Sequence, residues 1–323
     1  MVSDRYAAIR RFAKRTKEIF PAIVILTMFI TAVYVTCGTN PSMAMGESSG
    51  TGESNIAYIT GDNAWDTSAN VSRHTYTESK CGVVIVVNAN ESNYPVALAA
   101  SALTHHPRNG PVLFTPYESL ADSTLSEITR LDSLMGSVPI KILAVGELSQ
   151  NVTDRLAATG MAVEQIKGKN AYETAYMIDE MLGFPRTILI ASAADGGTAA
   201  CAAAWAAHAG TPILLVNGEE IPDATYRAIN NTYEPEIYII GNESAVPRSV
   251  DRRLRALNVK NVDRISGETP AGVSVNLAQF RNGLFGWGKM SDSANSFAIV
   301  RAGKWQDAIS AALLAHLNWH MPV

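Results

Sequence analysis

Gly168-Lys169-Asn170-Ala171-Tyr172-Glu173-Thr174 is a heptapeptide that the chain nearly repeats: residues 61–67 read Gly-Asp-Asn-Ala-Trp-Asp-Thr, and a degraded third copy begins at Gly267. Both complete copies keep Gly, Asn, Ala and Thr in place and put an aromatic residue before an acid. Internal repetition of this kind predicts a chain built from similar units, each too small to bury its apolar face alone. We therefore expect three related units in the main body.

The same order of elements follows each copy: an apolar strand, an Ala-rich helix and a strand led by proline. The helices open with 96–98, 197–199 and 307–309, and the prolines are Pro111, Pro212 and Pro322. Runs rich in Val and Ile are typical of strands buried on both faces of a parallel sheet. Such runs lie at 83–87, 112–114, 140–145, 187–190, 213–216, 237–240 and 297–300. The pattern predicts an α/β fold of tandem, small parallel sheets.

Two of these predicted strands, 140–145 and 237–240, end in glycine, at Gly146 and Gly241, and each precedes a polar turn and a helix. With these markers, the order of motifs resembles the type-two cell-wall-binding repeat. The resemblance covers residues 56–323. It implies three α/β repeats arranged as a pseudo-trimer on an exported protein, and attachment of that protein to anionic wall polymers.

The chain departs from the family pattern at two motifs. The arginine of the first motif is replaced by Ala64, Ala171 and Pro270, and the aspartate that opens the Ala-rich helix is kept only as Asp307. The resemblance therefore supports the fold more strongly than the binding chemistry, because one fold hosts many functions.

The N-terminal region has the pattern of an export segment. Ile19 to Val35 is an uncharged run after six basic residues, which are expected to stay in the cytoplasm. The run is either a retained anchor or a signal peptide cleaved near Ser42-Met43-Ala44. We expect a cytoplasmic basic stub at 1–18, a transmembrane helix or signal at 19–36, a flexible Gly- and Ser-rich stalk at 37–55, and repeats at 56–161, 162–260 and 261–323, the third incomplete.

Composition narrows the classes of partner. The 323 residues are 47% apolar and 17% charged, which excludes a disordered chain. Because residues 1–18 hold six basic residues against two acidic ones, the body is more acidic than the net charge of -4 suggests, which argues against nucleic acid. The three cysteines include no CxxC pair, so we expect no metal and no cofactor. Cys81 and Cys201 are read as buried thiols, with a disulfide as the alternative.

Aromatic and polar residues supply the first candidate ligand contacts. Asp195 and Thr198 belong to a turn that follows a predicted strand and opens a helix, where either a small anion or a simple helix cap is expected. Trp65 and Tyr172 occupy matching repeat positions, as core contacts or as stacking platforms for sugars.

Basic residues and sequons supply the others. The densest basic cluster is a candidate for an anionic polymer or for a solvated helix face, and it comprises Arg248, Arg252, Arg253 and Arg255. Five Asn-x-Ser/Thr sequons are glycosylation candidates in an exported protein. They are Asn70, Asn90, Asn151, Asn230 and Asn242.

Other motifs lack the context that their chemistry needs. Residues 46–50 match G-x-S-x-G but lie in the stalk, and residues 283–289 approach a P-loop without the strand that should precede it. His316 and His320 are four apart on the predicted last helix and would share a face, yet no glutamate completes a zinc motif.

The sequence therefore predicts a non-enzymatic cell-surface protein, membrane-anchored or secreted, that engages an envelope glycopolymer or a surface-layer protein. One alternative is a self-assembling subunit of a surface layer, sheath or filament, which would form a homo-oligomer. The other is a solute-binding or enzymatic α/β domain that uses the Asp195 turn. The sequence offers no set of nucleophile, base and orienting residue, so no catalytic residue is assigned.

Overall fold

The computed structural model describes residues 56–78, 81–136, 139–288, 296–316 and 320–323. The expected stub, anchor or signal, and stalk at 1–18, 19–36 and 37–55 lie outside these residues. Across the described ranges, no helix has both the length and the apolar character that crossing a bilayer requires.

The repeated heptapeptide is a helix-capping signal. It begins the helices α2 (Ala64–Thr75) and α6 (Ala171–Leu182). The caps are Asn63 and Asn170, whose side-chain oxygens each accept the backbone N–H three residues on, at 2.9 Å. Gly168 allows the chain to lie against its own helix, since a Cβ there would be 2.5 Å from that of Glu173. In both copies the asparagine side chain accepts an N–H that would otherwise have no partner at the helix start. This explains why the asparagine precedes the helix at the same place in both copies.

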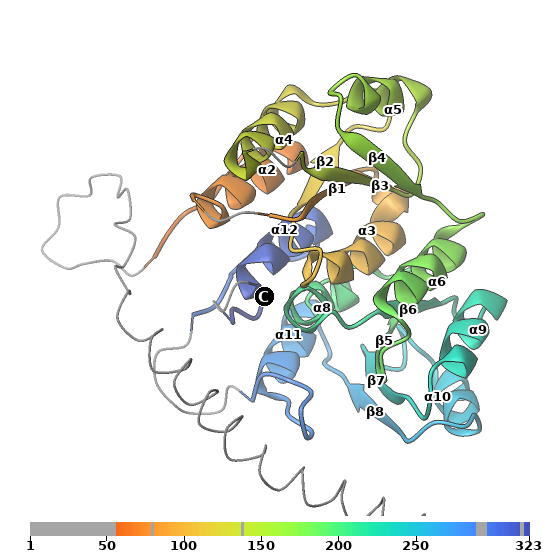
Figure 1. Cartoon of the computed structure of the whole chain (residues 1–323). Helices are drawn as coiled ribbons and strands as arrows, with labels where there is room; N and C mark the ends of the chain where they lie inside the picture. Colours follow the sequence, from red (N-terminus) through yellow and green to blue (C-terminus); the bar gives the residue numbers. More distant parts are fainter. Residues whose placement is uncertain (1–55, 79–80, 137–138, 289–295, 317–319) are drawn as a thin grey trace, which may run out of the picture. The chain divides into compact units, whose positions relative to one another are not determined.

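The first sheet is parallel, with strand order β2-β1-β3-β4 (Figure 1). Its strands are β1 (Val83–Asn88), β2 (Val112–Thr115), β3 (Lys141–Val145) and β4 (Ala162–Ile166). Alternate residues of β1 enter separate apolar clusters on the two faces, and every residue of the strand is buried. One face carries α4 (Asp122–Met135) and α5 (Gln150–Ala157), and the other carries α3 (Tyr94–Ala100).

The second sheet repeats this order as β6-β5-β7-β8. Its strands are β5 (Thr187–Ser192), β6 (Ile213–Val216), β7 (Glu236–Ile240) and β8 (Asn261–Ile265). Its further helices are α7 (Gly196–Ala199), α8 (Ala202–Ala209), α9 (Asp223–Asn231) and α10 (Arg248–Arg255). The predicted α/β fold with small parallel sheets is confirmed. The boundaries expected after residues 161 and 260 fall just before β4 and β8. Each of these strands pairs with the sheet that precedes it in the chain.

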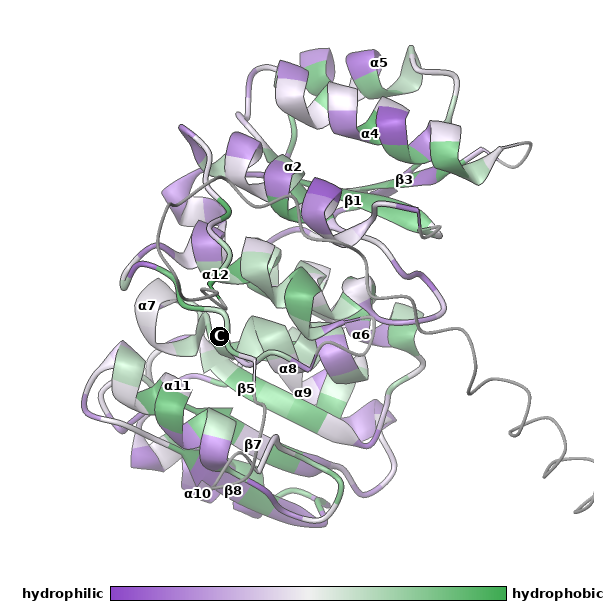
Figure 2. Cartoon of the chain, turned by 90° about the vertical axis from the view of Figure 1, so that its left-hand side faces the viewer, coloured by the Kyte–Doolittle hydropathy of each residue, from purple (hydrophilic) through white to green (hydrophobic). Residues whose placement is uncertain are grey.

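Ala-rich inner helices join the repeats. Helices α3, α8 and α12 (Trp305–Ala311) pack together, and the short 3-10 turns η2 (Ser101–Thr104) and η3 (Ala312–Ala315) extend α3 and α12; η1 (Glu91–Asn93) precedes α3. Small side chains let helix axes approach closely. In Figure 2, α8 is part of the pale to green layer between the two sheets, whereas α4, α5 and α10 carry purple polar residues.

The inner helices also contact the first helix of another repeat in a regular way. Helix α3 packs on α6, α7 on α11 (Pro270–Gln279), and α12 on α2. The last of these contacts closes the circle between the third repeat and the first. It is reinforced by Trp305 Nε1, which donates to Glu91 Oε2 at 2.7 Å, and by Gln306 Nε2, which donates to Glu91 Oε1 at 3.0 Å.

The third repeat has its helices but no assigned strand among its described residues. Helix α11 is capped by Thr269, and the strand predicted from Phe297 to Val300 makes a single cross-strand bond, from Ala298 N to Pro322 O at 3.0 Å. The corresponding bonds of the other repeats, to Pro111 O and Pro212 O, have the same length and begin full ladders. One bond does not define a strand, so the prediction for 297–300 was wrong in this respect.

Candidate functional site at the carboxyl end of the second sheet

Two hollows flank the turn after β7. Gly241 makes the turn with φ 117°, and a Cβ there would lie 3.1 Å from atoms of both Thr198 and Ala245. The next residue, Asn242, accepts the backbone N–H groups of Ser244 and Ala245 at 3.1 and 3.2 Å, and its amide donates to Gly267 O at 3.2 Å. These bonds fix the Asn242 side chain between the two hollows.

The first hollow, here called the junction groove, is an open depression of about 600 Å³ where β8 leads into α11. It is lined by Asn242, Ser266, Gly267, Glu268, Ala271, Gly272, Val275 and Asn276. Small side chains open it: the first turn of α11 carries Ala271 and Gly272, whereas α6 carries Tyr172 and Glu173 at the matching positions. Val275 is 54% exposed and gives the groove an apolar surface.

The second hollow, here called the arginine pocket, has a volume of about 450 Å³ and is lined by Glu243, Arg248, Asp251, Arg252 and Arg264. Arg248 Nε lies 2.5 Å from Glu243 Oε1. Asp251 is shared, because its Oδ1 lies 2.5 Å from Arg255 Nε and its Oδ2 lies 3.7 Å from Arg264 Nη2. The pocket therefore contains three cations and two anions.

Comparison with known proteins places the chain. A family model described as "Cell wall binding domain 2 (CWB2)" matches residues 59–151 and 165–251. The chain belongs to this family. The predicted membership is confirmed. The family model describes a binding domain, and the expectation that the chain is non-enzymatic stays a prediction.

Two curated relatives come from Bacillus subtilis (strain 168). The chain is 23% identical to N-acetylmuramoyl-L-alanine amidase LytC over 263 residues, covering 81% of the chain and 49% of LytC. It is 27% identical to the amidase enhancer over 211 residues, covering 64% of the chain and 26% of the enhancer. The CWB2 chain thus spans half or less of the length of these relatives.

Two solved structures share the CWB2 fold. Cwp8 from Clostridium difficile matches with a TM-score of 0.67 and 23% identity, over 82% of this chain and 43% of Cwp8. Cwp6 from the same organism matches with a TM-score of 0.63 and 20% identity, over 84% of this chain and 43% of Cwp6. At this identity the likeness establishes the fold alone.

The structure divides the predicted arginine cluster of the CWB2 chain. Arg248 and Arg252 line the arginine pocket, whereas Arg253 is exposed outside the lining and Arg255 pairs with Asp251. Sequence reasoning missed Arg264, which lies on β8 and not in the cluster. The sequence carries no clear signal for it, because β8 reads Asn-Val-Asp-Arg-Ile and lacks the apolar run that identified the other strands.

The other predicted contacts lie elsewhere. Thr198 donates both its backbone N–H, at 3.2 Å, and its hydroxyl to the Asp195 carboxylate, which is the geometry of a helix cap. Trp65 and Tyr172 are half-buried and pack against the large apolar core. Ligand contacts at these four residues remain predictions.

The five sequon asparagines differ in exposure and in the hydrogen bonds of their side-chain amides. Asn242 is bonded inside the turn beside the groove, and the Asn70 and Asn151 side chains donate to backbone carbonyls at 2.7 and 2.9 Å. Asn90 and Asn230 are exposed. Glycosylation at the five positions stays a prediction.

Two alternatives drawn from the sequence are corrected. Cys81 and Cys201 are free and buried rather than bridged, and burial raises the pKa of each thiol to about 12. His316 and His320 do not share a helix face, since η3 ends at Ala315 and His316 is extended. His316 instead faces His105, with ring centroids 5.8 Å apart. No group of described residues meets the geometry of a metal site.

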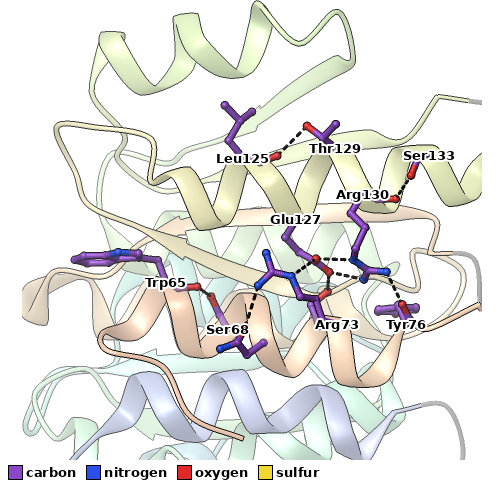
Figure 3. Close-up of polar contacts among 11 residues, drawn as sticks. Trp65, Ser68, Arg73, Tyr76, Leu125, Glu127, Thr129, Arg130 and Ser133 are labelled. Carbon is purple, nitrogen blue, oxygen red and sulfur yellow. Dashed lines mark hydrogen bonds and ion pairs between the residues drawn. The ribbon is translucent and has the colours of Figure 1, made fainter. Parts of the chain in front are cut away.

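A second charged network, in the first repeat, is structural (Figure 3). The fully buried Glu127 accepts Ser72 Oγ at 2.5 Å and both Nε and Nη2 of Arg130 at 2.7 Å, and Arg73 Nε lies 3.3 Å away. Arg130 Nη1 donates onward to Tyr76 O at 2.8 Å. A carboxylate supplied with this many donors is satisfied by the protein itself, so the network has the properties of a buried ion pair and not of an open binding site.

Proposed function

We propose that the chain attaches its protein to the cell wall by binding an envelope glycopolymer in the junction groove. The observation that carries the proposal is the groove itself, which exists where Ala271 and Gly272 replace the Tyr172 and Glu173 of the preceding repeat. A groove of about 600 Å³ is large enough for a sugar unit. Its combination of an apolar surface with a few placed polar groups is typical of ligand sites.

The polar rim suits a saccharide. The groove is lined by the hydroxyl of Ser266 and the carboxylate of Glu268 around the apolar Val275. It is also lined by the amides of Asn242 and Asn276, each of which donates one hydrogen bond to a backbone oxygen and keeps a second N–H. Amides and hydroxyls both donate and accept hydrogen bonds, which matches the hydroxyls of a sugar ring. The groove also lies beyond the carboxyl ends of parallel strands, the edge at which open α/β sheets bind ligands.

The test is co-sedimentation of the full chain with protein-stripped envelopes of the source organism. Wild-type chain should pellet saturably. The variant Ala271→Tyr/Gly272→Glu restores the side chains of the preceding repeat and should weaken binding by about tenfold or more, about 1.4 kcal/mol. A Cβ at Gly272 meets no atom closer than 3.5 Å, so the fold should tolerate it.

The matched control is Ala157→Tyr, an exposed alanine of α5 in the first repeat. It adds a tyrosine of the same size away from the groove and should pellet like wild type. Equal pelleting of the groove variant and the control would refute the groove as the binding site. Failure of the wild-type chain to pellet would refute polymer binding altogether.

A second candidate function is binding of a neighbouring surface protein, including another copy of the chain. It is favoured by residues 296–300, where Phe297 and Ile299 are 51% and 95% exposed beside the single bond from Ala298. An exposed apolar edge of this kind can pair with another chain. Self-association at rising concentration, measured by sedimentation equilibrium, would support it, and a monomer at all concentrations would exclude self-assembly.

A further inference from the structure

Arg264 is held rigidly at the floor of the arginine pocket. Its Nη1 donates to the backbone oxygens of Gly241 and Asn242 at 3.0 and 3.2 Å, and its side chain is 15% exposed. Its Nη2 is buried and has no hydrogen-bond acceptor among the described residues. Asp251 Oδ2, at 3.7 Å, is near enough for an ion pair but too far for a hydrogen bond. The guanidinium therefore has a fixed orientation and an unused donor.

Around Arg264, four arginines face only two carboxylates, which leaves two positive charges uncompensated. Glu243 is taken by Arg248, and Asp251 is shared between Arg255 and Arg264. Arg252 is exposed and, within the described ranges, forms no ion pair. Burial is the largest influence on the Arg264 side chain and lowers its pKa, with Asp251 and Glu243 acting in the opposite direction. A buried cation in this state is stabilised by an added anion.

The first repeat shows that the fold does not need this cluster. The register of β3–β4 and β7–β8 aligns Gln165 with Arg264. The buried Val152 and Leu156 of α5 correspond to the buried Val250 and Leu254 of α10. That alignment puts Gln150 and Asp154 where the second repeat has Arg248 and Arg252. The same backbone is thus built without a single arginine at these three positions.

The arginine pocket adjoins the junction groove. Asn242 lines the groove, the next residue Glu243 lines the pocket, and Arg264 binds the backbone oxygen of Asn242. We propose that the arginine pocket binds an oxyanion, a phosphodiester or a carboxylate, carried by the saccharide whose ring lies in the groove. This inference rests on the proposed function. It also shows how an acidic body binds an anionic polymer, through one local site.

The donors of the pocket fit an oxyanion. Its oxygens accept from Arg264 Nη2 and from Arg252 in the charge-assisted geometry typical of arginine. Within a polymer chain such oxygens come from a phosphodiester that joins two units or from a carboxylate on a sugar.

The test titrates the full chain with dimethyl phosphate, with glucuronate and with inorganic phosphate, and follows the backbone and arginine signals by NMR. Saturable shifts at Gly241, Asn242 and the Arg264 Nε are expected with at least one of the two monoanions. Whichever of these two saturates first identifies the oxyanion. Shifts spread over many surface cations, or saturable shifts with inorganic phosphate alone or with no probe, would overturn the inference.

Three variants localise the effect. Arg264→Gln installs the residue of the first repeat and should abolish the saturable shifts. Arg252→Gln changes an exposed side chain, leaves the bonds of Arg264 Nη1 intact and should weaken probe binding at least about threefold, which keeps the inference testable if Arg264→Gln fails to fold. Arg253→Gln, on the same helix outside the pocket, should bind the probes like wild type. Equal losses for Arg252→Gln and Arg253→Gln would refute the pocket.

Envelope pelleting separates this inference from the proposed function. If both hold, the arginine variants pellet less than wild type, and the wild-type interaction weakens with salt because charge pairing is screened. If Arg252→Gln and Arg264→Gln pellet as well as wild type while the groove variant does not, the oxyanion site is refuted and the groove stands. If wild type fails to pellet, polymer binding is refuted, and the probe titration alone decides whether the pocket binds an oxyanion.

Discussion

At the scale of single residues, the first two repeats place a buried carboxylate on different helices. Asp179 of α6 occupies the place of Ser72 in α2, and Ala228 of α9 occupies the place of Glu127 in α4. The carboxylate has thus moved to the other helix. Asp179 is fully buried, and neither of its oxygens has a hydrogen-bond partner among the described residues.

Burial raises the pKa of Asp179 from its usual 3.8 to about 8. Between these values the folded state keeps a proton that the unfolded state has lost, so this residue lowers stability as pH rises from about 4 to 8. Asp179→Asn should match wild type at pH 4 and gain at least about 2 kcal/mol at pH 8, measured by urea unfolding. The exposed neighbour supplies the control, Glu180→Gln. Parallel stability curves for wild type and Asp179→Asn would contradict the prediction.

These residues also mark the limit of what the sequence could predict about the site. Arg248 and Arg252 were found because they are neighbours in the chain. Arg264 and Asp179 acquire their properties from partners on other elements, and which strands pair in which register decides those partners. Composition and spacing carry no information about an unused donor or an unpaired oxygen.

At the scale of elements, the repeated heptapeptide requires glycine at its first position, which can be tested. A Cβ at Gly168 would lie 2.5 to 2.6 Å from atoms of Glu173 and Thr174, so Gly168→Ala forces the chain away from the start of α6. We expect a loss of roughly 1–3 kcal/mol in the free energy of unfolding. Gly197→Ala is the matched control, since its Cβ would meet atoms at 3.5 Å or more. A loss no greater than that of the control would disprove the close-approach argument.

Elements were the most predictable level of the structure. Continuous Val and Ile runs identified the buried strands because a parallel strand covered on both faces needs apolar residues at every position. The strand expected at 297–300 failed because a strand also needs partners, and Ala298 makes one bond only. The strands β4 and β8 did not appear in the sequence pattern, because they are short and partly polar, and only pairing assigns them to a sheet.

At the scale of the whole molecule, five of the six histidines gather where the inner helices end. His208 lies 4.6 Å from His320 between ring centroids, and its Nδ1 lies 3.2 Å from Ala315 O. His316 Nε2 donates to Asn109 Oδ1 at 2.6 Å. The remaining two members, His105 and His106, follow η2. The three repeats therefore bring their histidines into one cluster that no single repeat contains.

Burial lowers the pKa of His105, His208 and His316, the last to about 4 from the usual 6.5, and neighbouring histidines add to the effect. As pH falls below 6.5 the unfolded state takes up protons first, so stability falls toward pH 4. His316→Gln should flatten this acid limb by on the order of 2 kcal/mol in thermal or urea unfolding. An unaltered acid limb in His316→Gln would exclude the cluster as its cause.

The contact of α12 with α2 cannot form until most of the chain has been synthesised. Trp305 and its partner Glu91 are separated by 214 positions, and synthesis adds about 5–20 residues per second, so the first repeat waits roughly 10–40 s for the helix that covers it. Hydrophobic collapse of a chain this size takes far less than a millisecond per attempt. The first sheet is therefore complete long before its cover arrives. During that interval the inner face of the first repeat lacks the contact that α12 makes with it in the folded protein.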